Sequence, residues 1–281
     1  MSKAADMRQI ISIQSQVVHG HVGNSAAAWP MQALGATVAV VPTTLLSNHP
    51  HYPTMRGRVL EADLVADLLR GVEERGLVEN CAVLLTGYLG SVEVGQVVSA
   101  FVERALRRNP DTHCVCDPVI GDDGIGVFVA YGLPELIRDR LLPQARLATP
   151  NQFELEWLAK RPARNLEGIV AAVHEVRAGR SVDFAVTGCV LEDTPESQVE
   201  TIVAEGDAVT RISAPRIPVR PCGTGDLFTG VLVAHRSAGL SLCASARLAV
   251  QAVSAVLTQT QIRQSGEMVI TLDALTAKGE A

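Results

Sequence analysis

Apolar residues are distributed along the chain in two alternating patterns. Short apolar runs bounded by polar residues are typical of buried strands, and longer stretches with apolar residues every three or four positions are typical of helices. The pattern predicts strands over 9–14, 36–41, 81–85, 113–120, 146–149 and 182–187, and a hairpin over 200–203 and 209–212. It predicts helices over 24–34, 60–75, 92–107, 133–141, 150–160, 166–178, 226–238 and 241–259.

The alternation of strands and helices predicts an α/β fold with a mainly parallel sheet and helices on both faces. Hydrophobic residues make up 47% of the chain but aromatic residues only 4%, so the core consists of the aliphatic side chains that suit parallel strands. No linker rich in Pro, Ser or Gly divides the chain, which predicts one domain over 1–281 with a flexible tail over about 273–281. The region 42–58 has little periodicity and is expected to be irregular.

Charge and cysteine usage narrow the class of protein. The net charge of -6, without a block of Lys or Arg, argues against nucleic acid or an anionic membrane as the main partner. We expect no membrane span, because no apolar run approaches that length, and no signal peptide, so a cytoplasmic location is predicted. The cysteines show no metal-type spacing, and four lie in or beside apolar runs, which predicts reduced, mostly buried thiols at Cys81, Cys114, Cys116 and Cys189.

A glycine pair at 223–226 is the strongest chemical signal. Gly223, Thr224 and Gly225 allow a tight turn before a helix, and the amides and positive dipole end of that helix favour an anion. A carboxylate at Asp226 gains nothing from a bound phosphate, so we interpret it as the base that takes a proton from an attacking hydroxyl. The alternative is an ordinary turn in which Asp226 caps the helix.

Further polar residues follow the other predicted strands, where ligands of parallel sheets bind. Asp117, Asp122 and Glu154 are three carboxylates after neighbouring strands, and such a set favours Mg²⁺ bridged to phosphates. The hydroxyls of Thr149 and Thr187 could contact phosphate or a monovalent cation. The pairs His19/His21 and His49/His51 are interpreted as loop histidines, because no cysteine or third ligand lies near them in the sequence.

Taken together, these motifs carry a family resemblance. The opening block from Ser12 to Asn24, the segments 46–49 and 86–88 and the run Gly223-Thr224-Gly225-Asp226-Leu227-Phe228 resemble the pyridoxal kinases of the ribokinase-like superfamily, over nearly the whole chain. The resemblance implies a ribokinase-like three-layer α/β/α sandwich with a short substrate-covering loop. It also implies a homodimer that uses ATP and Mg²⁺, with K⁺ as a possible monovalent cation, to phosphorylate the 5′-hydroxyl of pyridoxal, and of pyridoxine and pyridoxamine, in vitamin B6 salvage to pyridoxal 5′-phosphate.

The resemblance assigns residues to each half of the reaction. The catalytic set is Asp226 with Gly223, Thr224 and Gly225. The vitamer side comprises Ser15, Val22, Leu46, His49, Pro50, His51, Tyr88 and Asp226, and the nucleotide side comprises Asp117, Thr149, Glu154, Thr187, Ala214, Pro215, Arg216, Ile217 and Thr224. Mg²⁺ is assigned to Asp117, Asp122 and Glu154. Pro50 stands where relatives commonly have threonine, and Leu46 where an aromatic residue is common, so the contacts of the covering loop are expected to differ.

Two other functions remain open from the sequence. A hydroxymethylpyrimidine kinase of thiamine synthesis phosphorylates a similar ring, but many of those enzymes have Gly-Thr-Gly-Cys where this chain has Asp226. A catalytically weak vitamin-binding protein is also compatible with the change at Pro50. Asp226 and the three carboxylates favour catalysis.

Overall fold

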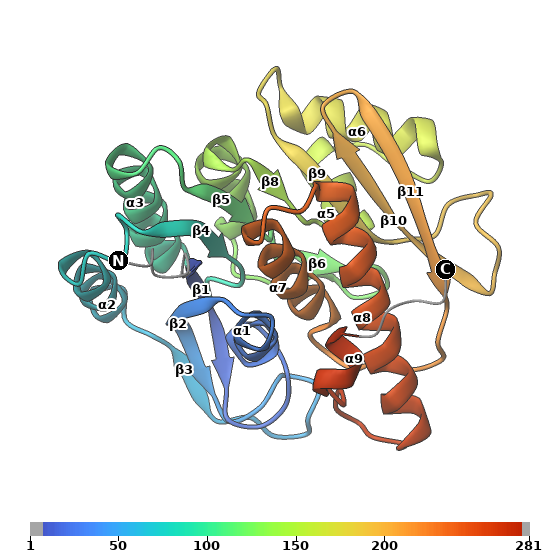
Figure 1. Cartoon of the computed structure of the whole chain (residues 1–281), viewed down its shortest axis with the longest axis horizontal. Coiled ribbons are helices and arrows are strands. Elements are labelled where there is room, and N and C mark those ends of the chain that lie inside the picture. The colour runs from blue at the N-terminus through green and yellow to red at the C-terminus, as the bar shows by residue number, and fades with distance from the viewer. Residues whose placement is uncertain (1–7, 277–281) are drawn as a thin grey trace, which may run out of the picture.

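One large sheet forms the centre of the computed structural model, which describes residues 8–276 (Figure 1). The order of its nine strands in the described chain is β11-β10-β9-β8-β5-β4-β1-β2-β3. In the central run β9-β8-β5-β4-β1-β2 all neighbouring strands are parallel. At the two edges of the sheet, β3, β10 and β11 pair antiparallel with their neighbours. The strands are β1 (Gln9–Val17), β2 (Thr37–Leu46), β3 (Gly57–Val59), β4 (Cys81–Thr86), β5 (His113–Cys116), β8 (Leu147–Ala148), β9 (Asp183–Cys189), β10 (Gln198–Glu205) and β11 (Ala208–Pro215). A separate hairpin joins β6 (Gly121–Asp122) and β7 (Gly126–Val127).

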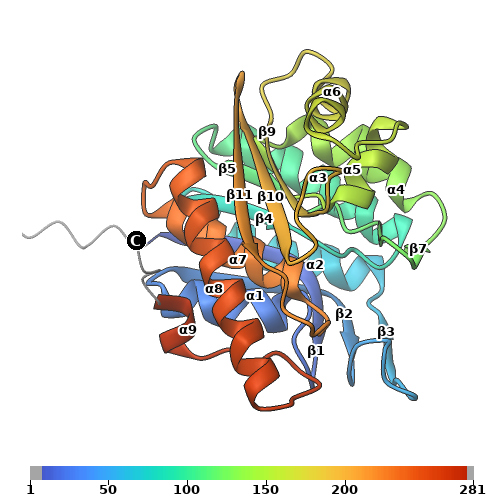
Figure 2. The same cartoon turned by 90° about the vertical axis from the view of Figure 1, so that its right-hand side faces the viewer.

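Helices cover both faces of this sheet (Figures 1 and 2). One layer contains α2 (Ala62–Glu74), α3 (Val92–Arg108), α4 (Leu133–Leu136), α5 (Gln152–Ala159) and α6 (Leu166–Arg177). The other contains α1 (Asn24–Ala33), α7 (Thr224–Ser237), α8 (Leu242–Ile262) and α9 (Leu272–Thr276). Alternate strand residues face opposite layers, as in β1, where Ile11 and Ile13 join one core and Ile10 the other. The predicted three-layer α/β/α sandwich is therefore confirmed.

Several element bounds differ from the predicted ones for local reasons. The parallel strand β5 ends at Cys116, before the expected 120, because Pro118 has no N–H to continue a ladder. Residues 42–46 continue β2, and Thr44 pairs with Val59 of β3, so the irregular segment shrinks to 47–56. Beyond α4, the predicted helix continues as a π-helical turn, Ile137–Leu141, and a 3-10 turn, Leu142–Gln144.

Helix α8 corrects one expectation. It is 21 residues long and by length and composition alone is apolar enough to cross a membrane, contrary to the prediction that no run has that character. In the structure α8 lies in the outer helical layer, where it packs against α7, α9, β10 and β11. Leu242, Ala246, Ala249, Ala252 and Val256 are buried in these contacts, whereas Ile262 at the end of the helix is exposed.

The C-terminal segment and the cysteines complete the comparison. The first residues of the expected flexible tail belong to α9, in which Ala274 and Leu275 are buried, and residues 277–281 lie outside the described residues. Cys81, Cys114, Cys116 and Cys189 are buried free thiols, as predicted.

Candidate active site

The glycine turn before α7 packs directly against a second glycine turn before α1. Gly223 has φ 82°, and a Cβ at this position would lie 1.8 Å from the carbonyl oxygen of His21. Gly23 has φ 53°, and its Cβ would lie 2.4 Å from Oγ of Ser15. No side chain fits at either contact, so both positions require glycine. The two turns bring Ser15 and Val22 of the predicted vitamer side next to the start of α7.

Asp226 lies in the first turn of α7. Burial raises the pKa of its carboxyl to about 6, although the backbone N–H of Gly23 donates a hydrogen bond that acts in the opposite direction. The first N–H groups of a helix have no partner within the helix, so those of Thr224 and Gly225 are available to an anion. Gly225 is exposed, and no atom outside its own helix and its chain neighbours lies within 4 Å of the point that a Cβ would occupy. The turn thus combines anion-binding amides with a carboxyl group whose pKa is near neutrality.

A buried carboxyl group, Asp117, follows β5. Its pKa is raised well above the ordinary value, first by burial and then by the negative charges of Asp226 and Glu154. Thr229 Oγ1 lies 3.4 Å from Oδ2 of Asp117 and 3.0 Å from Oγ1 of Thr149. The structure therefore brings together Asp117, Thr149 and Asp226 from three elements. Thr229 is a member that the sequence analysis missed, although it lies one turn after Asp226 on the same helix.

Glu154 has a different environment from that of Asp117. One of its carboxylate oxygens accepts a hydrogen bond from the N–H of Ile120 at 2.9 Å, and the other from the N–H of Asn151 at 2.8 Å. Together with the Asn151 side chain it forms a capping box at the start of α5. Burial raises the pKa of Glu154 to about 8, against these backbone hydrogen bonds. One of its oxygens thus holds the 120–121 turn and the other caps α5.

The third predicted metal residue, Asp122, is exposed on β6, where its carboxylate accepts a hydrogen bond from the N–H of Asp123 at 2.8 Å. The structure therefore does not bury Asp122 with Asp117. Its charge still contributes to the raised pKa of Glu154.

The remaining nucleotide-side residues lie further along the same sheet edge. Thr187 is half-buried, and its N–H donates to the carbonyl of Pro150 at 2.9 Å, which joins the ends of β8 and β9. Ala214 and Pro215 end β11, and Arg216 is exposed with its N–H bonded to the carbonyl of Ser197. Ile217 follows in the connection towards the glycine turn.

The vitamer-side residues lie at the ends of β1, β2 and β4, which are neighbours in the sheet. Ser15 is buried in β1, and the half-buried Tyr88 follows β4, where its carbonyl accepts a hydrogen bond from Oγ1 of Thr43 at 2.6 Å. Burial raises the pKa of the Tyr88 phenol, which is neutral near pH 7 even without that shift. Asp117 and Thr149 follow the next strands, β5 and β8, and Thr187 lies within β9. The sheet order therefore separates the residues predicted for the vitamer (the vitamer half) from those predicted for the nucleotide (the nucleotide half).

The loop 47–56, the predicted covering loop, leaves β2 beside these residues. Leu46 ends β2 half-buried, His49 is buried, and Pro50 and His51 are exposed. Nε2 of His49 lies 2.7 Å from Oε1 of Glu267, a residue that follows α8.

Glu267 also accepts a hydrogen bond from the hydroxyl of Tyr52 at 2.7 Å. Burial acts to raise its pKa, but the hydrogen bonds from Tyr52 and His49 prevail and lower it, so the carboxylate is charged. Glu267 was not predicted from the sequence, because no local motif surrounds it.

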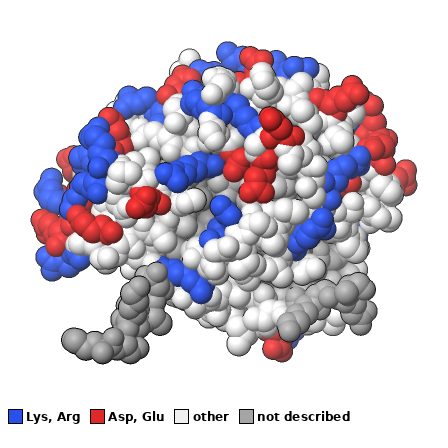
Figure 3. All heavy atoms as spheres, turned by 45° about the horizontal axis from the view of Figure 1, so that its top comes forward, with Lys and Arg blue, Asp and Glu red and all other residues white. Residues whose placement is uncertain are grey.

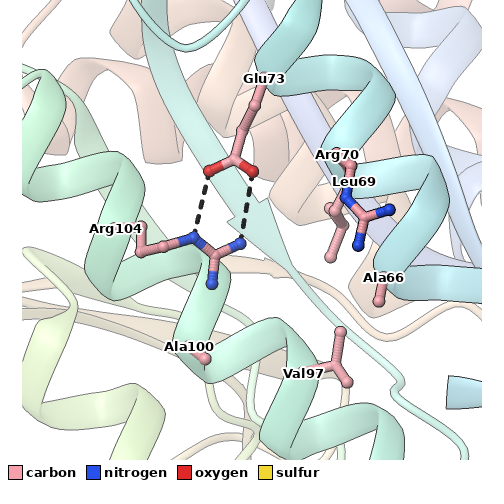
Figure 4. A pocket seen from close by; sticks show the side chains of 7 residues that line it. All are labelled: Ala66, Leu69, Arg70, Glu73, Val97, Ala100 and Arg104. Carbon is pink, nitrogen blue, oxygen red and sulfur yellow. Dashed lines mark hydrogen bonds and ion pairs between the residues drawn. The ribbon is translucent and has the colours of Figure 1, made fainter. Parts of the chain in front are cut away.

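Two surface features lie outside this arrangement. Figure 3 shows acidic and basic side chains interspersed on the face that it presents. Figure 4 shows a groove between α2 and α3 that an ion pair between Glu73 and Arg104 crosses at 3.2 Å. Its lining contains no residue that the sequence analysis assigned to the site; it comprises Ala66, Leu69, Arg70, Glu73, Val97, Ala100 and Arg104.

The chain is similar to known kinases over most of its length. Residues 31–270 match the phosphomethylpyrimidine kinase family. The chain is 40% identical over 260 residues to the pyridoxal kinase of Rubrobacter xylanophilus, which covers 92% of this chain and 90% of that protein. It is 37% identical over 265 residues to the pyridoxine/pyridoxal/pyridoxamine kinase of Bordetella avium, with 93% and 88% covered. The solved pyridoxal kinase of Leishmania donovani, in complex with ADP and pyridoxine, superposes with a TM-score of 0.83 at 27% identity and covers 95% of this chain and 93% of that one.

Proposed function

The chain belongs to the pyridoxal kinase family, and we propose that it transfers the γ-phosphoryl group of ATP to the 5′-hydroxyl of pyridoxal, with Asp226 as the base. The observation that carries the assignment of the base is the position of Asp226 in the first turn of α7, with a pKa of about 6. A base with a pKa near the working pH is deprotonated and still able to take a proton. Pyridoxine and pyridoxamine carry the same hydroxymethyl group and are proposed as further substrates in vitamin B6 salvage.

In the proposed reaction the carboxylate of Asp226 accepts the proton of the 5′-hydroxyl as its oxygen attacks the γ-phosphorus. The bond from this phosphorus to the β,γ-bridging oxygen breaks, and ADP leaves. The N–H groups of Thr224 and Gly225 stabilise the charge that develops on the phosphoryl oxygens. Ser15 and Tyr88, from adjacent strands, bind and orient the pyridine ring, and the covering loop excludes water so that ATP is not hydrolysed.

Mg²⁺ fits the carboxyl groups of the nucleotide half. Asp117 is buried beside the charges of Asp226 and Glu154, and such uncompensated carboxylates favour a hard cation. Asp117 would hold the ion directly, whereas both oxygens of Glu154 already accept backbone hydrogen bonds. When bound, Mg²⁺ neutralises charge on the ATP phosphates. The hydroxyls of Thr149 and Thr229 lie beside Asp117 and are available to contact what binds there. A monovalent cation such as K⁺ is proposed to bind in the same nucleotide half.

The rival kinase of the hydroxymethylpyrimidine ring uses the same fold and the same matched family. The curated relatives that cover about nine tenths of this chain are pyridoxal kinases, and Asp226 stands where many of the rival enzymes have cysteine. Pyridoxal is therefore the proposed substrate. A binding protein without turnover would have no need of the raised pKa at Asp226.

Purified protein with ATP and Mg²⁺ tests the proposal when it is supplied in turn with pyridoxal, pyridoxine, pyridoxamine and hydroxymethylpyrimidine. Phosphorylated vitamer is the expected product, and Asp226→Asn should lower its rate of formation by about 10²- to 10⁴-fold while ATP still binds. Preferred turnover of hydroxymethylpyrimidine, or a near wild-type rate of the variant, would overturn the substrate or the base respectively. Sedimentation of the same sample tests the proposed homodimer.

A further inference from the structure

Two histidines and a cysteine lie together beside the glycine turn, although they are far apart in the sequence. Sγ of Cys222 is 3.0 Å from Nδ1 of His51. His49, His51 and Cys222 each offer a ligand atom, and these atoms all lie within 4.8 Å of one another. The rings of His49 and His51 meet edge to face, with centroids 5.8 Å apart. The tertiary fold thus supplies the cysteine that the sequence around the histidines lacks.

His49 is already held in the way that metal-ligating histidines usually are. Its side chain is buried, and its Nε2 lies 2.7 Å from Oε1 of Glu267. Its other ring nitrogen, Nδ1, is buried and has no hydrogen-bond partner among the described residues. A carboxylate on one imidazole nitrogen fixes the tautomer and leaves a lone pair on the other. A buried nitrogen without a partner is costly, so this lone pair points to a ligand that completes the site.

We propose that His49, His51 and Cys222 bind one Zn²⁺ ion, which ties the covering loop to the turn before α7. One thiolate and two imidazoles select zinc over Mg²⁺, which prefers the oxygen ligands of the carboxylate cluster. Binding breaks the S–H bond of Cys222 and forms a metal–sulfur bond, and the proton passes to solvent, so no oxidant is needed. Three protein ligands leave the fourth position of a tetrahedral ion open.

The ligand spacing is close to what zinc requires. Bonds of about 2.0 to 2.3 Å in a tetrahedron place two ligand atoms about 3.5 Å apart. The Cys222–His51 pair is within this spacing, and the atoms of the whole set, within 4.8 Å, need a movement of about 1 Å. His51 is exposed on a loop that can supply that movement.

Titration of the full-length protein with Zn²⁺, in the presence of Mg²⁺, tests the site. We expect one zinc per chain, and Co²⁺ as a probe should give a thiolate-to-metal absorption band. Cys222→Ser should abolish the band and lower zinc affinity at least about tenfold, the loss typical even of an outer-sphere change. Cys243→Ser is the matched control, since Cys243 is also a half-buried free thiol. Absence of binding to the wild type, or equal binding by both serine variants, would overturn the proposal.

A second measurement tests the tie between the two segments without using kinase activity. Arg56 is exposed at the end of the covering loop and is a site for trypsin. Zn²⁺ should slow cleavage after Arg56 in the wild type and in Cys243→Ser, but not in Cys222→Ser or His51→Ala. His51 is exposed, so His51→Ala decides the question if Cys222→Ser fails to fold. If zinc binds without slowing cleavage after Arg56, the proposal that it holds the covering loop to the turn before α7 is wrong.

Discussion

Nε2 of His49 lies 2.7 Å from Oε1 of Glu267, which connects the loop after β2 to the segment after α8 across 218 residues. The hydroxyl of Tyr52 donates to the same carboxylate oxygen. Both donors belong to the covering loop 47–56, so one charged acceptor fixes the position of that loop. The loop in turn borders the proposed vitamer half of the site.

Glu267→Gln should loosen the covering loop, because a neutral amide accepts hydrogen bonds more weakly than a carboxylate. We expect the KM for pyridoxal to rise about tenfold, which corresponds to about 1.4 kcal/mol. The KM for ATP should change little. Steady-state kinetics with each substrate varied separately measure both values, and Tyr52→Phe, which removes one of the two donors, should give a smaller rise. A shift confined to ATP would contradict this role of Glu267.

The pH dependence of kcat/KM should report the ionisation of Asp226. The base acts only when deprotonated, and its pKa in the folded protein is raised to about 6. Activity should therefore be highest above this pH and fall about tenfold for each pH unit below it. The residual activity of Asp226→Asn should lack this acid limb. A wild-type profile that is flat between pH 5 and 7 would exclude a carboxyl group with this pKa as the base.

Asp117→Asn should stabilise the protein without ligands while impairing its activity. Burial and the charges of Asp226 and Glu154 raise the pKa of Asp117 in the folded state, so the folded protein binds more protons than the unfolded chain, and stability falls as pH rises. The variant and wild type should therefore be similar near pH 4. At pH 8 the variant should be more stable by about 1 kcal/mol or more.

Denaturant unfolding at the two pH values measures this difference, and kinase assays at varied Mg²⁺ measure the loss of function. Asp67→Asn is a suitable control, because Asp67 is exposed on α2 and pairs with Arg70, and its effect should stay within about 0.5 kcal/mol. A variant that is less stable than the wild type at pH 8 would contradict the predicted strain between the carboxylates.

Pro50→Thr should restore a polar contact in the covering loop. Proline fixes φ and has no N–H, and Pro50 is exposed between His49 and His51. A threonine hydroxyl that binds the vitamer would contribute about 1 kcal/mol and lower the KM for pyridoxal by roughly 3- to 10-fold. The KM for ATP serves as the internal control. An unchanged KM for pyridoxal would show that residue 50 does not contact the vitamer.

The sequence by itself determined the layers of the fold and the chemistry at the strand ends. Apolar residues recur every 2 positions in strands and every 3.6 in helices, which is a local property, so the alternation of elements could be predicted without coordinates. The run Gly223 to Asp226 is likewise a local motif. The same rule that places ligands at the ends of parallel strands identified Asp117 and Thr149. The residues contacting Asp117 were recognised only partly, since Thr229 has no motif of its own.

Only the tertiary structure decided which of these groups meet. Both carboxylate oxygens of Glu154 accept hydrogen bonds from backbone N–H groups, and Asp122 is exposed. Glu267 and Cys222 contact the covering loop from segments far along the chain. Contacts of this kind depend on strand order and on how loops pack across the edge of the sheet. Sequence periodicity records which face a residue occupies but not which distant residue lies opposite it, and for that reason these contacts could not be predicted.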